Sequence, residues 1–323
     1  MQAILAVTVP FFALVLAGWL AARRGVLPES AIPGLNAYVL FFALPCMLMR
    51  FGMNTPVLEL LNPAVLAVYV LCALVVVGFT IAVSLNATVG LKDASFGALV
   101  AAFPNTGFMG VPLLVALLGP AAAGPVISSV LADLFVTSSL CIALSQLEGA
   151  GAGGAGARTA ALRALRGALS NPLPWAIAIG AVLSATGLRT SGPLDTALRM
   201  LADSATPVAL FTIGAVLWRA GRHAHTRTPL AHYLPVAAIK LLLHPLLVLL
   251  VGAGAQRLGA PLSGFQLLVL TLAAALPSAS NVSLLTERYG ADSGRVARII
   301  LASTVGAFAS FSALAWLFGV QPA

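Results

Sequence analysis

Charged residues are scarce in this sequence. Only 8% of its 323 residues are Asp, Glu, Lys or Arg, while 60% are apolar. A soluble globular chain carries about 25% charged residues. The scarcity of charge excludes a soluble domain and, with a mean hydropathy of +1.03, predicts an integral membrane protein.

Residues that carry redox, metal or nucleotide chemistry are also few. Three cysteines, Cys46, Cys72 and Cys141, stand in apolar segments without a CxxC motif or a histidine partner, which predicts buried free thiols and no disulfide. Neither of the two lysines follows a phosphate-binding GxxxxGK[ST] pattern, and no HExxH motif is present. We therefore predict a protein that is not an enzyme and has no catalytic residue, bound metal or cofactor.

The basic residues that are present lie between the apolar segments. The net charge is +8 and the isoelectric point is near 10.3, values that could suggest nucleic-acid binding. Because the charges form no single patch, we interpret them as determinants of membrane topology and as partners of lipid headgroups, and expect no nucleic-acid partner.

Ten segments are apolar and long enough to cross a bilayer core of about 30 Å. They form two sets of five around a Gly/Ala-rich stretch, so we predict a first five-helix repeat at 1–147, a flexible linker at 148–170 and a second repeat at 171–323. The predicted segments are Ala3–Ala22, Leu35–Phe51, Pro63–Leu85, Ser95–Leu118, Ala122–Leu147, Pro172–Gly187, Leu198–Trp218, Leu230–Gln256, Leu262–Tyr289 and Arg298–Phe318.

An odd number of helices in each half gives the two halves opposite orientations. If both termini lie outside, the cytoplasmic ends carry most of the Lys and Arg residues, the outer ends carry only Arg50, Arg189, Arg199 and Arg257, and Lys240 remains inside the membrane. This positive-inside bias predicts an all-α membrane protein with both termini outside and ten helices in two inverted repeats.

The fourth and ninth segments are interrupted at equivalent places, by Pro104-Asn105-Thr106-Gly107 and by Pro277-Ser278-Ala279-Ser280-Asn281. Proline frees a backbone carbonyl, and an unpaired backbone group in hydrocarbon costs several kcal/mol. Such breaks persist where they are buried in protein or line a wet cavity, and a matched pair of them indicates a transporter's substrate site.

We therefore predict that the two breaks cross near the membrane midplane. Each half-helix after its proline should begin with free N–H groups and a positive dipole end, which favours a carboxylate. Val100 and Ala273 should have freed carbonyls that could hold a cation or a donor group of the substrate. The predicted substrate-binding residues are Pro104, Asn105, Thr106, Gly107, Pro277, Ser278, Ser280 and Asn281. The alternative without a binding site is that both breaks are only proline kinks, at which neighbouring polar side chains form hydrogen bonds with the freed backbone groups.

Ionisable residues inside the membrane are functional candidates by default. Asp133 lies in the fifth segment, and Lys240 and His244 lie one turn apart in the eighth. Asp133 could carry a proton or hold a cation, and Lys240 could balance an anionic substrate. The alternatives are a buried Asp133–Lys240 pair that only joins helices, and a His244 side chain that bonds a backbone carbonyl.

Four segments resemble the auxin efflux carrier family, whose bacterial members include malonate and dicarboxylate carriers. The resemblance spans the chain and rests on Asn36 to Pro45, Phe103 to Pro112, Pro207 to Gly214, and Pro277 to Asn281 with Tyr289-Gly290. It implies an architecture similar to bile-acid transporters and sodium/proton antiporters. Helices 1, 2, 6 and 7 would form a scaffold, often dimeric through helices 2 and 7, and helices 3–5 and 8–10 a transport domain. The family's crossover prolines map onto Pro104 and Pro277, and its crossover asparagine onto Asn105.

The sequence thus predicts a secondary transporter of small organic anions that works by elevator-type alternating access. Two alternatives stay open. One is a cation/proton antiporter of the same architecture, although that class usually needs a carboxylate at the crossover. The other is a membrane sensor that binds a ligand without moving it.

Overall fold

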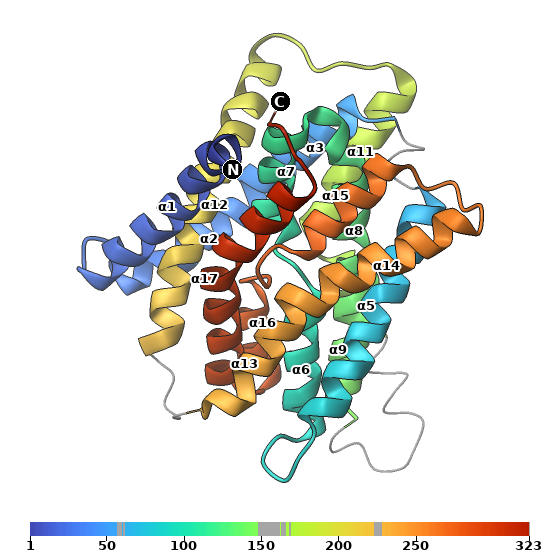
Figure 1. Cartoon of the computed structure of the whole chain (residues 1–323). Helices are drawn as coiled ribbons and strands as arrows, with labels where there is room; N and C mark the ends of the chain where they lie inside the picture. The colour runs from blue at the N-terminus through green and yellow to red at the C-terminus, as the bar shows by residue number, and fades with distance from the viewer. Residues whose placement is uncertain are drawn as a thin grey trace.

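In a computed structural model the chain is a bundle of tilted helices (Figure 1). The structure describes residues 1–56, 60, 62–147, 162, 166–167, 169–222 and 228–322. Most of the predicted linker at 148–170 lies outside these residues. The first half contains α1 (Gln2–Arg23), η1 (Glu29–Ala31), α2 (Ile32–Tyr38), η2 (Val39–Ala43), α3 (Leu44–Asn54), α5 (Pro63–Ser84), α6 (Leu91–Ala102), η3 (Thr106–Gly110), α7 (Val111–Leu118), η4 (Pro120–Ala122), α8 (Ala123–Ala132), η5 (Asp133–Thr137) and α9 (Ser138–Ser145).

The second half follows a similar order of long, short and broken helices. It contains α11 (Pro172–Thr186), α12 (Gly192–Arg222), α13 (Leu230–Ala238), η6 (Ile239–Leu243), α14 (His244–Arg257), α15 (Gly264–Ala274), α16 (Val282–Tyr289) and α17 (Ser293–Leu317). Continuous helices therefore cover most of the predicted segments, and the fourth and ninth are interrupted at the predicted prolines.

Within the described residues, seven helical stretches are long and apolar enough to cross a membrane. Three shorter apolar helices, Thr106–Leu118, Pro172–Thr186 and Gly264–Ala274, fall in the predicted fourth, sixth and ninth segments. The chain is therefore a multi-pass helical membrane protein. The short helices are short because prolines break the fourth and ninth segments, and because α11 begins at Pro172 and ends at the left-handed Gly187.

Some helices begin earlier than hydropathy predicts. The tenth begins at Ser293 and not at Arg298, because the Asp292 carboxylate caps its first turn by accepting from the Arg295 N–H at 2.9 Å. The seventh begins at Gly192, six residues before the predicted Leu198. In both cases the first turn contains a charged residue, Asp195 or Arg295, which lowers the mean hydropathy there, so hydropathy alone places the start of the helix too late.

Two helix pairs pack closely through glycines. In the contact of α1 with α12, a Cβ at Gly18 would collide with the backbone of Phe211, and one at Gly214 with the backbone of Val15. In the contact of α3 with α11, a Cβ at Gly180 would collide with Met49. Small residues allow membrane helices to approach in this way.

The glycines of the two pairs have the same spacing. Gly18 and Gly52 are 34 residues apart, and so are Gly180 and Gly214. The first helix of each half thus packs on the second helix of the other half: α1 packs on α12, and α11 packs on α3. We call α1, α2, η2, α3, α11 and α12 the glycine-packed group, and the remaining helices, α5–α9 with their η turns and α13–α17, the crossing group.

Arg295 joins four helices of the crossing group at one end. Its guanidinium donates to the carbonyls of His232 at 2.8 Å and Asp93 at 2.7 Å, and to the Ser84 hydroxyl at 3.3 Å. The side chain is only 3% exposed, and Gly97 leaves the space that it occupies. Burial of a charge is tolerated when its donors are paired in this way, so this arginine ties α5, α6, α13 and α17 together.

In the part of the chain that the structure describes, four helical stretches contain a single wide π-turn, at η2, η3, η5 and η6. In three of them a proline follows at the second residue of the next helix, namely Pro45, Pro112 and Pro245. Because proline has no N–H to donate, the ladder of helical hydrogen bonds is displaced there. The turns η5 and η6 contain the buried Asp133 and Lys240.

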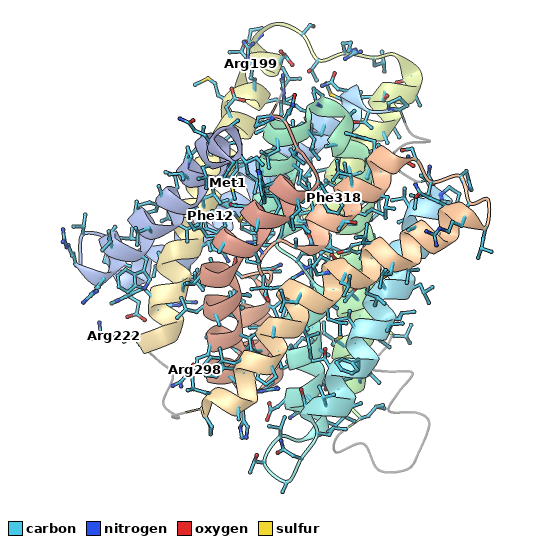
Figure 2. All side chains as sticks on the ribbon, in the orientation of Figure 1. Met1, Phe12, Arg199, Arg222, Arg298 and Phe318 are labelled. Carbon is cyan, nitrogen blue, oxygen red and sulfur yellow. The ribbon has the colours of Figure 1, made fainter. Side chains whose placement is uncertain are left out.

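The basic residues mark two ends of the molecule (Figure 2). Arg222 and Arg298 lie at the lower end of the view and Arg199 at the upper end, and both chain termini lie in the upper half of the bundle. We call these the Arg222 end and the Arg199 end.

Candidate functional site

The two proline breaks cross and pair through their backbones. The Asn105 N–H donates to the Pro277 carbonyl at 2.8 Å, and the Ala279 N–H donates to the Phe103 carbonyl at 3.0 Å. Pro104 and Ser278 thus form an isolated antiparallel bridge. The pairing satisfies backbone groups that the breaks would otherwise leave without partners, and it holds both breaks in a fixed register.

Ser278 secures the crossing. Its hydroxyl donates to the Val100 carbonyl at 2.6 Å, and its N–H donates to the Ser303 hydroxyl at 3.1 Å. Val100 is the residue whose carbonyl Pro104 should free. The expectation that this carbonyl would be available to a ligand was wrong, because a side chain from the other break already occupies it.

The second predicted free carbonyl is also occupied. The Ala273 carbonyl accepts from the Leu276 N–H at 3.2 Å, in a tight last turn of α15. Its neighbour, the Ala274 carbonyl, accepts from the Lys240 ammonium at 2.6 Å. Lys240 therefore lies at the carbonyl end of a half-helix, where the dipole favours a cation.

Asn105 and Asn281 behave differently from Ser278. Both line a cavity of 20 Å³ at the crossing, together with Gly107. Asn105 is 3% exposed, and in the part of the chain that the structure describes neither side-chain amide forms a hydrogen bond. Both amides are therefore free to pair with a ligand or water in the cavity.

The two half-helices after the breaks are not equivalent. In the run Thr106–Leu118, which starts at the cavity, the Thr106 N–H donates to the Pro104 carbonyl at 2.8 Å and the Met109 N–H to the Asn105 carbonyl at 3.0 Å, whereas the Gly107 N–H forms no hydrogen bond with the described residues. In α16 the first N–H groups are already bonded, since Val282, Ser283 and Leu284 donate to carbonyls three residues earlier at 3.2–3.3 Å. The expectation of free N–H groups in both halves was wrong for the second half.

Thr106 and Gly110 pack inside the protein and do not face the cavity. Thr106 is fully buried and its hydroxyl lies 3.5 Å from the Pro104 carbonyl. A Cβ at Gly110 would lie 2.6 Å from the Leu276 side chain. Gly110 therefore makes room for the other break.

Larger cavities adjoin the crossing at the Arg222 end. A cavity of 300 Å³ shares Asn281, Phe103, Phe108 and Leu134 with the small one, and its polar lining includes Asn36, Asn171, Ser138, Arg288 and Tyr289. A cavity of 220 Å³ lies beside it, between α2, α12 and α16, and contains Ser280, Asn281 and Arg219. The crossing is therefore bordered by polar space on this side.

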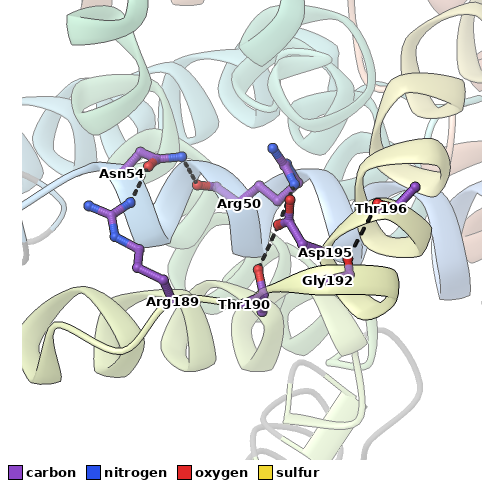
Figure 3. Close-up of polar contacts among 7 residues, drawn as sticks. All are labelled: Arg50, Asn54, Arg189, Thr190, Gly192, Asp195 and Thr196. Atoms are coloured by element: carbon purple, nitrogen blue, oxygen red, sulfur yellow. Dashed lines mark hydrogen bonds and ion pairs between the residues drawn. The ribbon is translucent and has the colours of Figure 1, made fainter.

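A cavity of 490 Å³ lies at the other end, between α3, α7 and α12, and its polar lining is Arg50, Asn54, Asp203 and Thr206. Figure 3 shows how two of these residues, Arg50 and Asn54, are held. The Arg50 guanidinium pairs with the Asp195 carboxylate at 3.1 Å, Thr190 donates to the same carboxylate at 2.7 Å, and Arg189 donates to Asn54 at 2.8 Å. The pair Arg50–Asp195 is about one-third exposed.

Asp133 lies next to the crossing and is fully buried. It accepts from the Tyr69 hydroxyl at 2.8 Å and from the Thr137 hydroxyl at 3.0 Å. Tyr69 and Thr137 were not singled out by sequence. Tyr69 could have been found from the sequence, because a single tyrosine inside an apolar segment usually needs a hydrogen-bond partner for its hydroxyl when it is buried, and a buried carboxylate is such a partner.

Lys240 and His244 form a separate cluster. The Lys240 ammonium lies 3.2 Å from His244 Nδ1, while His244 Nε2 is buried without a hydrogen-bond partner among the described residues. Asp133 and Lys240 form no ion pair in that same part of the chain, where the only salt bridge is Arg50–Asp195. The interpretation of a direct Asp133–Lys240 pair was wrong, because Lys240 bonds a helix end and Asp133 bonds hydroxyls.

A chain of buried polar groups around two crossed, broken membrane helices is typical of membrane transport proteins. The comparison with known families agrees: residues 3–154 and 156–317 match the family described as "Membrane transport protein". The chain belongs to this family, that of the auxin efflux carriers, as the resemblance predicted.

Curated relatives are similar over most of their length. A Rhizobium meliloti (strain 1021) protein named "Putative malonate transporter" is 28% identical over 100% of this chain and 99% of its own. The "Uncharacterized transporter YfdV" of Escherichia coli (strain K12) is 25% identical over 87% of this chain and 86% of its own. An "Uncharacterized transporter" of Methanothermobacter thermautotrophicus is 28% identical over 90% of this chain.

Proposed function

We propose that this transporter carries small organic anions, such as carboxylates, across the bacterial cytoplasmic membrane. The observation that carries the proposal is the pair of amides at the crossing. Asn105 and Asn281 come from the two breaks, line one cavity and have no partner within the described chain. The side-chain amide N–H groups and the backbone N–H of Gly107, which lines the same cavity, are donors that suit a carboxylate.

The substrate-binding set that we propose is narrower than the one predicted from sequence. Asn105, Gly107, Ser280 and Asn281 line the cavities at the crossing. Pro104 and Pro277 create the breaks, Ser278 holds them together and Thr106 packs inward. The full-length relative named for malonate supports a carboxylate as the class of substrate.

The proposed architecture is ten helices in two inverted five-helix repeats. The equal spacing of the glycine pairs supports it, because each half contributes the same contact with exchanged partners. We assign the glycine-packed group to a scaffold, which forms a homodimer through α3 and α12, and the crossing group to a transport domain that moves as an elevator. Arg295 supports this division, since its bonds stay inside the crossing group.

We place the Arg222 end in the cytoplasm and both termini outside. Arg23, Arg219, Arg222 and Arg288 belong to this end by the positive-inside pattern. The cavities beside the crossing at this end then correspond to an inward-facing state.

The driving force follows from charge. A charge that crosses the full membrane gains about 2.3 kcal/mol per 100 mV, so export of an anion from a cell that is negative inside needs no coupling ion, whereas uptake does. Asp133 is our candidate proton carrier, because it is buried one residue from Leu134, which lines the crossing cavity. The antiporter alternative is weaker, since Asn105 and Asn281 stand where that class needs a carboxylate.

Uptake into proteoliposomes tests the proposal. Radiolabelled malonate, lactate and an aromatic acid are supplied with and without a pH gradient or a membrane potential. We expect saturable flux of at least one acid, lost in Asn105→Ala and retained in Asn86→Ala, an exposed asparagine of a surface turn. Asp133→Asn should remove any dependence on the pH gradient. Binding without flux under every gradient would favour the sensor, and proton flux exchanged for a metal cation would favour the antiporter.

A further inference from the structure

Arg219 lines the same cavity as the crossover residues but lies on the opposite wall. The cavity of 220 Å³ has α16 and the second break on one side, with Ser280 and Asn281, and α2 and α12 on the other, with Asn36 and Arg219. Such a volume holds several water molecules or a small organic ion. Arg219 is half-buried and lines this space.

The other described arginines that are not exposed all have partners. Arg50 pairs with Asp195, and Arg295 and Arg298 donate to backbone carbonyls. Arg219 forms no hydrogen bond, ion pair or ring contact with the residues that the structure describes. A half-buried guanidinium has five N–H donors to satisfy and a fork geometry that matches a carboxylate.

Asn281 connects this cavity to the crossing. It lines the small cavity with Asn105 and also the cavity of Arg219. A ligand that accepts from Asn281 therefore has Asn105 to one side and Arg219 to the other. Two donor sites of this kind, separated by one amide, fit a molecule with two acidic groups a few bonds apart.

We propose that Arg219 binds the second carboxylate of a short dicarboxylate whose first carboxylate is held by Asn105 and Asn281. The assignment rests on the proposed function and specifies its substrate class. It makes Arg219 a specificity-determining residue: a monocarboxylate satisfies the amides and leaves the guanidinium unpaired, whereas a dicarboxylate satisfies both. Because Arg219 belongs to the glycine-packed group and Asn281 to the crossing group, the contact spans the two groups.

The test compares Arg219→Gln with Arg222→Gln, a matched control three residues further along the same helix, whose side chain stacks on Trp218. Malonate and its monomethyl ester are similar in size and differ by one negative charge. We expect Arg219→Gln to raise the KM for malonate at least ~10-fold, a loss of about 1.4 kcal/mol, and to leave the KM for the monomethyl ester nearly unchanged. Arg219→Lys should fall between the wild type and Arg219→Gln, because it keeps the charge and loses the fork.

Equilibrium binding of malonate to purified protein by calorimetry gives a readout that does not depend on transport. Equal losses for malonate and the ester, or no loss for either, would overturn the role of Arg219 while leaving the carboxylate carrier intact. If the wild type neither binds nor transports any carboxylate, the proposed function fails together with this assignment. Retained flux of the ester in Arg219→Gln shows that the variant is folded.

Discussion

Ser278 and Ser280 show how two similar residues of one motif can have different roles. The Ser278 hydroxyl donates a hydrogen bond to the Val100 carbonyl across the crossing. The Ser280 hydroxyl forms no hydrogen bond within the described residues, and Ser280 lines the cavity of Arg219. The sequence pattern does not separate them, because each stands within three residues of Pro277. The difference arises from the register of the crossing, which is a long-range property.

Ser278→Ala should therefore destabilise the protein, and Ser280→Ala should not. Loss of the Ser278 hydroxyl leaves the buried Val100 carbonyl without its donor, at a cost of about 1–3 kcal/mol. We expect a lower Tm in detergent for Ser278→Ala and a Tm close to wild type for Ser280→Ala, measured by the fluorescence of the native tryptophans. The opposite order would show that Ser278 does not hold the crossing.

At the scale of helices, hydropathy predicts where the spans lie, and the prolines predict where they break. Their contacts are less predictable. Lone buried ionisable residues such as Asp133 and Lys240 are conspicuous in an apolar sequence, but their partners, Tyr69 and the Ala274 carbonyl, are brought to them only by packing. Likewise, the sequence does not show that three helix ends converge on Arg295.

The glycine pairs give an element-scale prediction. Gly214→Ala should weaken the packing of α1 on α12, since the added methyl would collide with the Val15 backbone, and overpacking typically costs about 1–3 kcal/mol. Gly78→Ala on α5 is the matched control, because no atom lies within 4 Å of the position of its Cβ. We expect a lower Tm for Gly214→Ala only, and equal Tm values would contradict the packing role.

The whole molecule consists of two groups of helices that meet at the cavities. Asn36 of α2 and Leu284 of α16 line the same cavity from opposite groups. Asp93 and Asp292 lie within the crossing group, with the Asp292 N–H donating to the Asp93 carboxylate at 2.7 Å. A cross-link between Asn36 and Leu284 would therefore block motion between the two groups, whereas a cross-link between Asp93 and Asp292 would connect residues of one group only.

Cysteine cross-linking uses this contrast. In a background with the native Cys46, Cys72 and Cys141 replaced, the double variant Asn36→Cys/Leu284→Cys should lose transport when bridged by a bifunctional thiol reagent and regain it on reduction. Asp93→Cys/Asp292→Cys, bridged in the same way, should keep transport, because both residues move together. Transport that survives the first bridge would exclude an elevator movement between the groups.

The ion pair Arg50–Asp195 has a further consequence for the whole cycle. Its Arg50 side chain lines the cavity of 490 Å³ beside α7, the half-helix that follows the first break, and about one-third of each side chain of the pair is exposed. Screening by salt weakens exposed pairs. If α7 must pass this cavity when the site opens outward, the turnover rate becomes sensitive to ionic strength on one face of the membrane and not on the other, and the carrier is then kinetically asymmetric.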